Sequence, residues 1–243
     1  MITALRSILF VVLFYLNLAV LLIAALPTLL MPRPAILVVA RVWGRTTLWL
    51  LRTVCGIGVE WRSLHNLPKG GALIAAKHQS TWETFALLTL LPDPAYIIKR
   101  ELAWIPFFGW YAMHAGMIPI DRSAGKRALI DMTARACAAV RHGRQLIIFP
   151  EGTRRSAGAE PKYKFGVAHL YADAGVPCVP VALNSGLFWP RRRLMRYPGT
   201  IIVEFLDPIA PGLSRDAFFA RLQDDVETAT ARLVAEGRRE PRH

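Results

Sequence analysis

The apolar and polar positions divide the chain into two parts with different patterns. In the first part, residues 8–26 are all apolar except for Asn17, and Pro27 and Pro32 follow. A helix of this length, at about 1.5 Å per residue, spans roughly 28 Å, close to the thickness of a bilayer core. A secretory signal has a shorter apolar stretch, about 7–15 residues, before its cleavage site. The pattern therefore predicts a membrane anchor, with a cleaved signal or a buried core helix as alternatives.

The stretch that follows, residues 34–56, has the period of an amphipathic helix. Arg41, Arg45 and Arg52 fall within about 40° of one another on a helical wheel of roughly 100° per residue. The opposite side is apolar and consists of Ile36, Val39, Trp43, Leu50 and Val54. Two interpretations stay open. The helix lies in the membrane interface with its arginines toward phosphate headgroups, or it packs on the rest of the protein.

After residue 58 the pattern changes to short apolar runs that alternate with amphipathic helices. Alternation of this kind predicts an α/β fold with a mixed, largely parallel sheet flanked by helices, here joined to N-terminal membrane-embedded helices. The predicted strands are 71–76, 95–98, 116–120, 145–149, 178–183 and 200–205. The predicted helices are 81–91, 128–141, 163–174 and 214–236.

Charge and cysteine content narrow the class of protein. The 30 Lys and Arg residues against 17 Asp and Glu give a net charge of +13, so an anionic partner is expected. Residues 1–57 carry five arginines and no acid and are also the most apolar part, which favours a membrane over nucleic acid. More arginines follow the first apolar segment than precede it, so the positive-inside rule predicts a cytoplasmic domain. The three cysteines are far apart, which excludes a disulfide framework and a CxxC zinc site.

The first candidate for chemistry follows the predicted strand 71–76. His78 comes at the end of that strand, and Glu83 comes five residues later in the first turn of the next helix. A carboxylate against one ring nitrogen fixes the tautomer and leaves the other nitrogen as a base. Ser80 and Glu83 also have the spacing of a capping box. The pattern alone leaves catalysis and helix capping open.

The second candidate is the segment Phe149–Arg154, which follows the strongest predicted strand. Gly152 permits close approach of the backbone, so that N–H groups face a phosphate or an oxyanion. Arg154 supplies fork donors that suit a phosphate. A surface turn with a solvated charge pair is the alternative.

Two further blocks also follow predicted strands. Lys99–Leu102 is charged, and Gly116–Arg122 ends in Asp121 and Arg122, which suit a phosphate or form an exposed ion pair. The strand that contains Val179–Val181 runs into the polar turn 184–186, expected beside the site. Residues 190–196 then contain four arginines. Either these arginines bind anionic headgroups or an acidic carrier protein, or they form a solvated basic loop.

These blocks, in this order and spacing, resemble the motifs of the glycerolipid acyltransferases, above all the 1-acyl-glycerol-3-phosphate acyltransferase (PlsC-like) family. The matches to the family's motifs are His78 with Glu83 for His-x4-Asp, Lys99–Leu102 for Lys-x-Glu-Leu, Gly116–Arg122 for Gly-x-x-x-Ile-Asp-Arg, Phe149–Arg154 for Phe-Pro-Glu-Gly-Thr-Arg, and Val179–Val181 for Val-Pro-Val. One position departs from the pattern, because Glu83 replaces the family's aspartate.

The resemblance implies direct acyl transfer without an acyl-enzyme. His78 is expected to be the general base and Glu83 the group that orients it. Backbone N–H groups near Gly152 are expected to hold the oxyanion. The predicted substrate-binding residues are Lys99, Arg122, Glu151, Gly152, Thr153 and Arg154, with Arg122 and Arg154 at the acceptor phosphate and Glu151 near its glycerol hydroxyls.

The predicted acceptor is lysophosphatidate, taken from membrane lipid and converted to phosphatidic acid, with acyl-CoA or acyl carrier protein (ACP) as co-substrate. No metal, redox cofactor or nucleic acid is expected. Another lysolipid such as a lyso-ornithine lipid, glycerol 3-phosphate as acceptor, and a catalytically inactive membrane lipid-binding protein remain alternatives. The expected organisation is a membrane anchor and interfacial helix over residues 1–57, an acyltransferase domain over 58–236 on the cytoplasmic side of the cell membrane, and a charged tail over 237–243.

Overall fold

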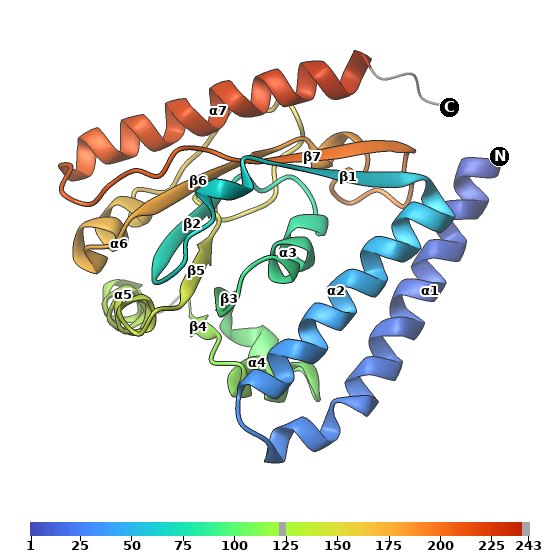
Figure 1. Cartoon of the computed structure of the whole chain (residues 1–243), viewed down its shortest axis with the longest axis horizontal. Coiled ribbons are helices and arrows are strands. Elements are labelled where there is room, and N and C mark those ends of the chain that lie inside the picture. The colour runs from blue at the N-terminus through green and yellow to red at the C-terminus, as the bar shows by residue number, and fades with distance from the viewer. Residues whose placement is uncertain (122–124, 240–243) are drawn as a thin grey trace.

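The structure is a computed structural model that describes residues 1–121 and 125–239. Within them, seven strands form one sheet in the order β1-β7-β6-β2-β5-β3-β4 (Figure 1). Only β6 and β7 pair antiparallel, and the other neighbours are parallel. The mixed, largely parallel sheet is therefore confirmed. The strands are β1 Ile57–Arg62, β2 Ala72–Ala76, β3 Pro94–Lys99, β4 Ile118–Ile120, β5 Gln145–Ile148, β6 Cys178–Leu183 and β7 Gly199–Phe205.

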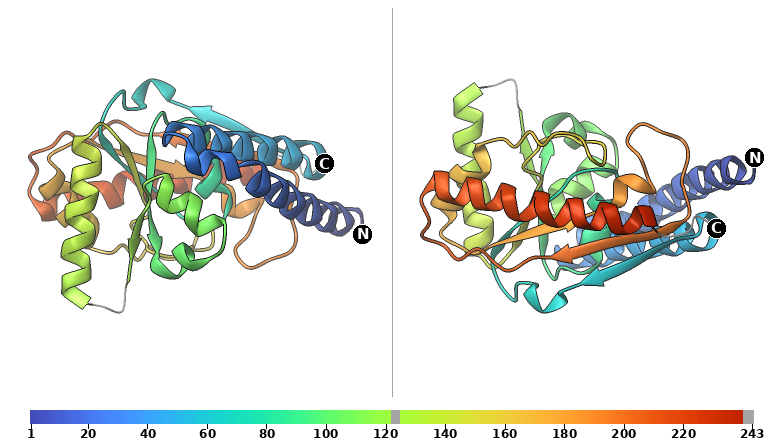
Figure 2. Two further views of the ribbon diagram at one scale, coloured as in Figure 1. Left: turned by 90° about the horizontal axis from the view of Figure 1, so that it is seen from below. Right: turned by 90° about the horizontal axis from the view of Figure 1, so that it is seen from above.

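Helices cover both faces of this sheet (Figures 1 and 2). The α-helices are α1 Ile2–Ala24, α2 Pro34–Cys55, α3 Trp82–Ala86, α4 Phe108–His114, α5 Gly125–Arg141, α6 Gly166–Ala174 and α7 Arg215–Arg239. Short 3-10 helices are η1 Leu26–Leu30, η2 Leu64–Asn66, η3 Leu87–Thr89, η4 Arg100–Trp104 and η5 Ser185–Leu187. Helices α5, α6 and α7 pack on one face, and α1, α2 and α3 pack on the other.

Strand β2 shows how the sheet is buried between these two layers. Leu73 and Ala75 point to the cluster formed with α5, α6 and α7, whereas Ile74 and Ala76 point to the cluster formed with α2 and α3. All five residues of β2 are buried. A strand covered on both faces reads as a continuous apolar run, which is why it was predicted correctly.

Several element boundaries differ from the predictions. Strand β1 was not predicted, although Ile57, Val59 and Trp61 alternate with polar residues or glycine. Helix α3 is shorter than predicted and passes into the 3-10 turn η3. Helix α6 begins at Gly166 and not at residue 163, and the Lys164 N–H before it donates to the carbonyl of Pro150. The end of α7 at Arg239 places the first residues of the expected tail inside a helix.

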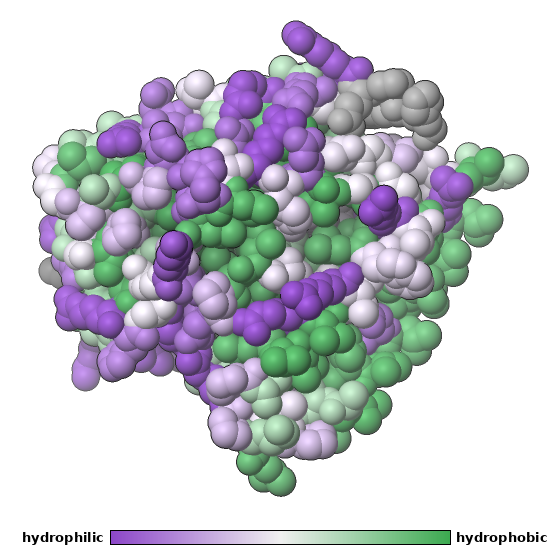
Figure 3. All heavy atoms as spheres, viewed as in Figure 1, coloured by the Kyte–Doolittle hydropathy of each residue, from purple (hydrophilic) through white to green (hydrophobic). Residues whose placement is uncertain are grey.

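Helices α1 and α2 form an antiparallel hairpin along one side of the molecule (Figure 1). Both are long and apolar enough to cross a membrane. In α1 the side chains that face away from the domain are large and apolar, for example Val12 and Leu16. Apolar side chains gather on this side of the surface (Figure 3).

Helix α2 packs on the domain, so the second of its two interpretations holds for its apolar face. Ile36 and Leu50 are buried against the protein, and Arg41 donates to the carbonyls of Leu91 and Pro92. The face predicted to enter the acyl boundary is therefore a protein contact. The exposed apolar residues of α2 are instead Val38, Val42 and Trp49.

Candidate active site

The residues singled out in the sequence lie at one edge of the sheet. Strands β2, β5, β3 and β4 run parallel, so their C-terminal ends share the edge at which open α/β sheets bind ligands. His78 follows β2, the segment Phe149–Arg154 follows β5, and Lys99 ends β3. Blocks far apart in the sequence are thereby brought to one side of the molecule.

His78 and Glu83 are in direct contact. Nδ1 of His78 lies 2.9 Å from Oε1 of Glu83, and the ring stacks on Phe149 with centroids 4.0 Å apart. An ionised carboxylate only accepts hydrogen bonds, so this contact assigns the proton to Nδ1. The side chain of His78 is 12% exposed, and within the described residues its Nε2 has no hydrogen-bond partner. The geometry is that of an oriented imidazole with its basic nitrogen toward solvent.

The Glu83 carboxylate also caps α3. Oε1 accepts the N–H groups of Gln79 and Ser80, both at 2.7 Å, and Ser80 Oγ accepts the N–H of Trp82 at 2.8 Å. Oε2 accepts the hydroxyl of Ser185 at 2.9 Å, which places the polar turn after β6 beside the site as expected. Capping and orientation of His78 are therefore properties of one buried carboxylate, and the two interpretations of this motif do not exclude each other.

Both carboxylate oxygens of Glu151 are bonded within the protein. Its side chain is fully buried, and Oε1 lies 2.9 Å from Nζ of Lys77, while Oε2 accepts the N–H of His78 at 3.1 Å. Burial raises the pKa of Glu151, and the charge of Lys77 opposes this shift. The prediction that Glu151 contacts the glycerol hydroxyls is therefore not supported, because both oxygens are bonded within the protein. Glu227 on α7 completes this network at 2.6 Å from Lys77 Nζ, and no sequence signal pointed to it.

The turn after β5 is tied to His78 on both sides. The N–H of Arg155 donates to the His78 carbonyl at 2.8 Å, opposite the bond from the His78 N–H to Glu151. Gly152 has φ +64°, a conformation that favours glycine. Its N–H donates to the Phe149 carbonyl at 2.9 Å, so this amide closes the turn and is not available to an oxyanion.

The other predicted binding residues in this turn are exposed. Thr153 and Arg154 both face solvent, and Nη1 of Arg154 lies 2.5 Å from Oγ1 of Thr81, three residues after His78. Lys99 is exposed at the end of β3, and no contact among the described residues joins it to His78. Arg122 lies outside the residues that the structure describes.

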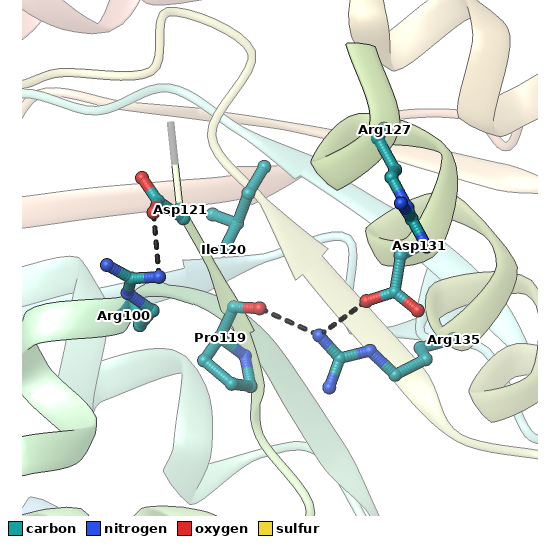
Figure 4. A pocket seen from close by; sticks show the side chains of 7 residues that line it. All are labelled: Arg100, Pro119, Ile120, Asp121, Arg127, Asp131 and Arg135. Carbon is teal, nitrogen blue, oxygen red and sulfur yellow. Dashed lines mark hydrogen bonds and ion pairs between the residues drawn. The ribbon is translucent and has the colours of Figure 1, made fainter. Parts of the chain in front are cut away.

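A cavity of about 490 Å³ lies next to the end of β4 (Figure 4). Arg100 pairs with Asp121 at 2.8 Å, and Arg135 pairs with Asp131 at 3.1 Å. Arg127, also on α5, points toward the same space and has no ion pair within the described chain. Three arginines and two aspartates line the cavity. It suits the binding of an anionic part of a substrate.

Comparison with known proteins assigns the chain to a family. Residues 58–184, which include His78, Glu83 and the segment Phe149–Arg154, match the family described as Acyltransferase. The chain belongs to the acyltransferase family. The match covers the strands from β1 to β6 and the residues around His78, so the family is shown by the part of the chain that builds the site.

Relatives of this acyltransferase carry more specific names. A 1-acyl-sn-glycerol-3-phosphate acyltransferase of Pseudomonas aeruginosa is 42% identical over 66% of this chain and 63% of its own length. The human 1-acyl-sn-glycerol-3-phosphate acyltransferase alpha is 30% identical over 80% of this chain and 71% of its own. The chain thus spans less than two thirds of the Pseudomonas relative.

The fold has a close counterpart among solved structures. The crystal structure of the 1-acyl-sn-glycerophosphate acyltransferase PlsC from Thermotoga maritima superposes with a TM-score of 0.77. The match covers 94% of this chain and 97% of that one at 23% sequence identity. It therefore includes the α1–α2 hairpin as well as the sheet, and confirms the predicted architecture.

Proposed function

We propose that this acyltransferase moves a fatty acyl group from acyl-CoA or acyl-ACP to the sn-2 hydroxyl of lysophosphatidate and so forms phosphatidate. The names of the relatives support this acceptor. The observation that carries the proposal is the 2.9 Å contact between His78 Nδ1 and Glu83 Oε1. It leaves the second ring nitrogen at the surface of the site, where a general base for a hydroxyl group is required.

In the proposed reaction, Nε2 of His78 is the general base. Nε2 of His78 takes the proton of the sn-2 hydroxyl as its oxygen attacks the thioester carbonyl. Glu83 stabilises the imidazolium that forms, as the third group does in a catalytic triad. The tetrahedral intermediate then collapses, the carbon–sulfur bond breaks, and the departing thiolate takes the proton from Nε2. The products are the ester and a free thiol, and the acyl group is never bonded to the protein.

The developing oxyanion needs hydrogen-bond donors. Because the Gly152 N–H already closes the turn, we assign this role to the amides of Thr153 and Arg154. Neither amide donates to another residue of the described chain. Fixed backbone donors aimed at the oxyanion are usually a large part of the stabilisation of an acyl-transfer transition state.

The acceptor's phosphate is assigned to cations of the predicted binding set. Arg154 lies beside Thr81 and near His78, and its guanidinium has the planar geometry that binds phosphate. Lys99 ends β3, and Arg122 comes two residues after β4 in the sequence, outside the described residues. We retain both as candidates for the same phosphate. Glu151 is instead a positioning residue, because it holds the backbone of His78.

Attachment to the membrane gives the acceptor access to the site. Exposing an acyl chain of sixteen carbons to water costs on the order of 12 kcal/mol, at roughly 0.8 kcal/mol per CH₂. Helices α1 and α2, which are long and apolar enough to span a bilayer, keep the site at the lipid surface and reduce this cost. We place the domain on the cytoplasmic side of the cell membrane, as the positive-inside rule favours.

A substrate panel tests the proposal. The full chain, purified in a neutral detergent, is assayed with lysophosphatidate, a lyso-ornithine lipid and glycerol 3-phosphate, each with labelled acyl-CoA and with acyl-ACP. We expect the highest kcat/KM with lysophosphatidate. A higher value with another acceptor would overturn the acceptor assignment. Absence of turnover with every pair would favour an inactive lipid-binding protein, and the two donor series identify the carrier.

A further inference from the structure

A second hollow, of about 310 Å³, lies between α1 and the loop 189–196. One wall is aromatic and apolar and belongs to α1, where Phe10 and Phe14 pack on Trp189. The opposite wall is the arginine-rich loop, and Thr81 and Arg154 close the remaining side. This volume is at the lower end of the range of small-molecule sites. The family match ends before the loop.

Arg196, which lines this hollow, is a buried cation. Its side chain is buried, 7% exposed, and its guanidinium stacks over Trp189 with 4.2 Å to the ring centroid. Nη1 donates to the carbonyls of Arg193 and Leu194 at 2.7 and 2.8 Å. Nε is buried and has no partner, and no carboxylate pairs with this cation within the described chain. Burial lowers the pKa of Arg196 to about 10, which leaves it charged at neutral pH.

Three more cations in the same loop are unpaired. The side chains of Arg191, Arg192 and Arg193 make no hydrogen bond or ion pair with any described residue, and Arg192 has φ +56°, which is uncommon for a residue other than glycine. No acidic residue is among those that line the hollow. A buried cation without a counter-ion, next to three unpaired ones, is costly unless an anion binds.

The apolar wall specifies the rest of the ligand. Helix α1 continues from the hollow into an exposed apolar face, which includes Val12, Tyr15 and Leu16. A ligand that fits both walls has an anionic head and a hydrocarbon tail. Free phosphate matches only the arginines, and an acidic protein surface matches only the exposed part of the loop.

We propose that this hollow binds the phosphate headgroup of an anionic bilayer phospholipid, with its acyl chains along α1. The lipid holds the site face of the domain against the membrane and takes no part in the reaction. Arg154, assigned above to the acceptor phosphate, also lines this hollow, so the bound lipid lies next to the acceptor, and its headgroup is assigned to the arginines of residues 191–196 alone.

The experiment measures lipid retention. The full chain in a neutral detergent is titrated with dioleoylphosphatidylglycerol or dioleoylphosphatidylcholine, and bound lipid is counted by native mass spectrometry. The test variant is Arg191→Gln/Arg193→Gln, which removes two unpaired charges, one half-buried and one exposed, without touching the buried Arg196. The matched control is Arg215→Gln/Arg221→Gln, at the far end of α7 (Figure 1), where both arginines are exposed.

We expect the wild type and the control to retain one phosphatidylglycerol in preference to phosphatidylcholine. The test variant should lose about 30-fold in affinity for phosphatidylglycerol, about fivefold per arginine near a lipid phosphate. An equal loss in the control would overturn the proposal in favour of general charge attraction. Full displacement by inorganic phosphate would show a free anion site.

The second measurement is the KM of the test variant for the acceptor. With a short-chain, water-dispersed lysophosphatidate, the test variant should keep the wild-type KM. A raised KM would show that the hollow belongs to the acceptor and would contradict the proposal. Because retention of phosphatidylglycerol is measured without turnover, its outcome is separate from that of the substrate panel.

Discussion

At the scale of single residues, the Glu83 carboxylate joins two tasks that the sequence presented as alternatives. It accepts hydrogen bonds from four donors, namely the ring of His78, two backbone amides and the hydroxyl of Ser185. A fixed carboxylate holds the imidazole in one tautomer and orientation. The extra methylene relative to the family's aspartate is accommodated because Glu83 lies in the first turn of α3 and reaches back to His78.

Substitution of Glu83 by glutamine separates the two tasks. The amide oxygen of Glu83→Gln still accepts backbone N–H groups, whereas the neutral side chain does not stabilise an imidazolium. We expect kcat to fall by at least about 10²-fold, with the melting temperature little changed. Steady-state kinetics and thermal unfolding check this. A variant that stays active but melts at a much lower temperature would show that Glu83 acts only as a cap.

Arg154 gives a second prediction at this scale. It is exposed, so Arg154→Ala removes a phosphate contact without a packing defect. We expect KM for lysophosphatidate to rise by at least about tenfold with kcat little changed, since a charge-assisted hydrogen bond contributes roughly 1.5–3 kcal/mol. Arg141→Ala, also exposed and remote on α5, serves as the control. An unchanged KM for the Arg154 variant would remove Arg154 from the phosphate site.

At the scale of elements, ion pairs join the turn of the α1–α2 hairpin to the domain. Arg33, directly before α2, pairs with Asp93 through two hydrogen bonds, and Asp93 also pairs with Arg144 at 3.1 Å. Burial tends to raise the pKa of Asp93, but the hydrogen bond from Arg33 and the charges of both arginines together outweigh this and lower it. Arg144 is itself buried, which lowers its pKa.

The lowered pKa predicts how these ion pairs depend on pH. Since the folded pKa of Asp93 lies below its ordinary value of 3.8, its stabilising contribution is complete above that value and is lost as pH falls through the folded pKa. We expect Asp93→Asn to lower the free energy of unfolding at pH 7 by on the order of 2 kcal/mol. The difference from wild type should shrink below about pH 4. Denaturant titrations at several pH values measure it, and a pH-independent difference would contradict the assignment.

How much the sequence could predict differs between elements and contacts. Buried strands such as β2 and β6 are continuous apolar runs, and the blocks after them were located by position alone. Strand β1 shows that alternation over six residues is easily missed beside a long helix. The pairing of Lys77 with Glu227, 150 positions away, has no local signal. Nor does the sequence say that Gly152 uses its N–H within the turn, because that depends on the local backbone path.

At the scale of the whole molecule, α1 is part of the domain as well as an apolar surface. Phe10 is fully buried, with its ring 5.4 Å from that of Trp189, and it belongs to the same apolar cluster as β2 and α3. The Ser7 hydroxyl accepts the N–H of Arg196 at 2.8 Å. The sequence pattern therefore changes at residue 57, but the segments before and after it share one hydrophobic core.

This sharing predicts that a single residue of α1 stabilises the domain. We expect Phe10→Ala to lower the free energy of unfolding by about 3–5 kcal/mol, because it leaves a cavity against Trp189. Val12→Ala, on the exposed face of α1, should change it by less than about 0.5 kcal/mol. Denaturant unfolding of the detergent-solubilised chain compares the two. Equal small effects would mean that α1 is a detachable anchor.

The account depends most on His78 as the base, and His78→Asn tests it most directly. Asparagine carries its amide nitrogen at the position of Nδ1 and so keeps a donor for Glu83, but it cannot take a proton from a hydroxyl group. In initial-rate assays with lysophosphatidate, we expect kcat to fall by at least about 10²-fold, with the melting temperature and acceptor KM close to wild type. A folded variant that retains nearly the full rate would contradict the central claim.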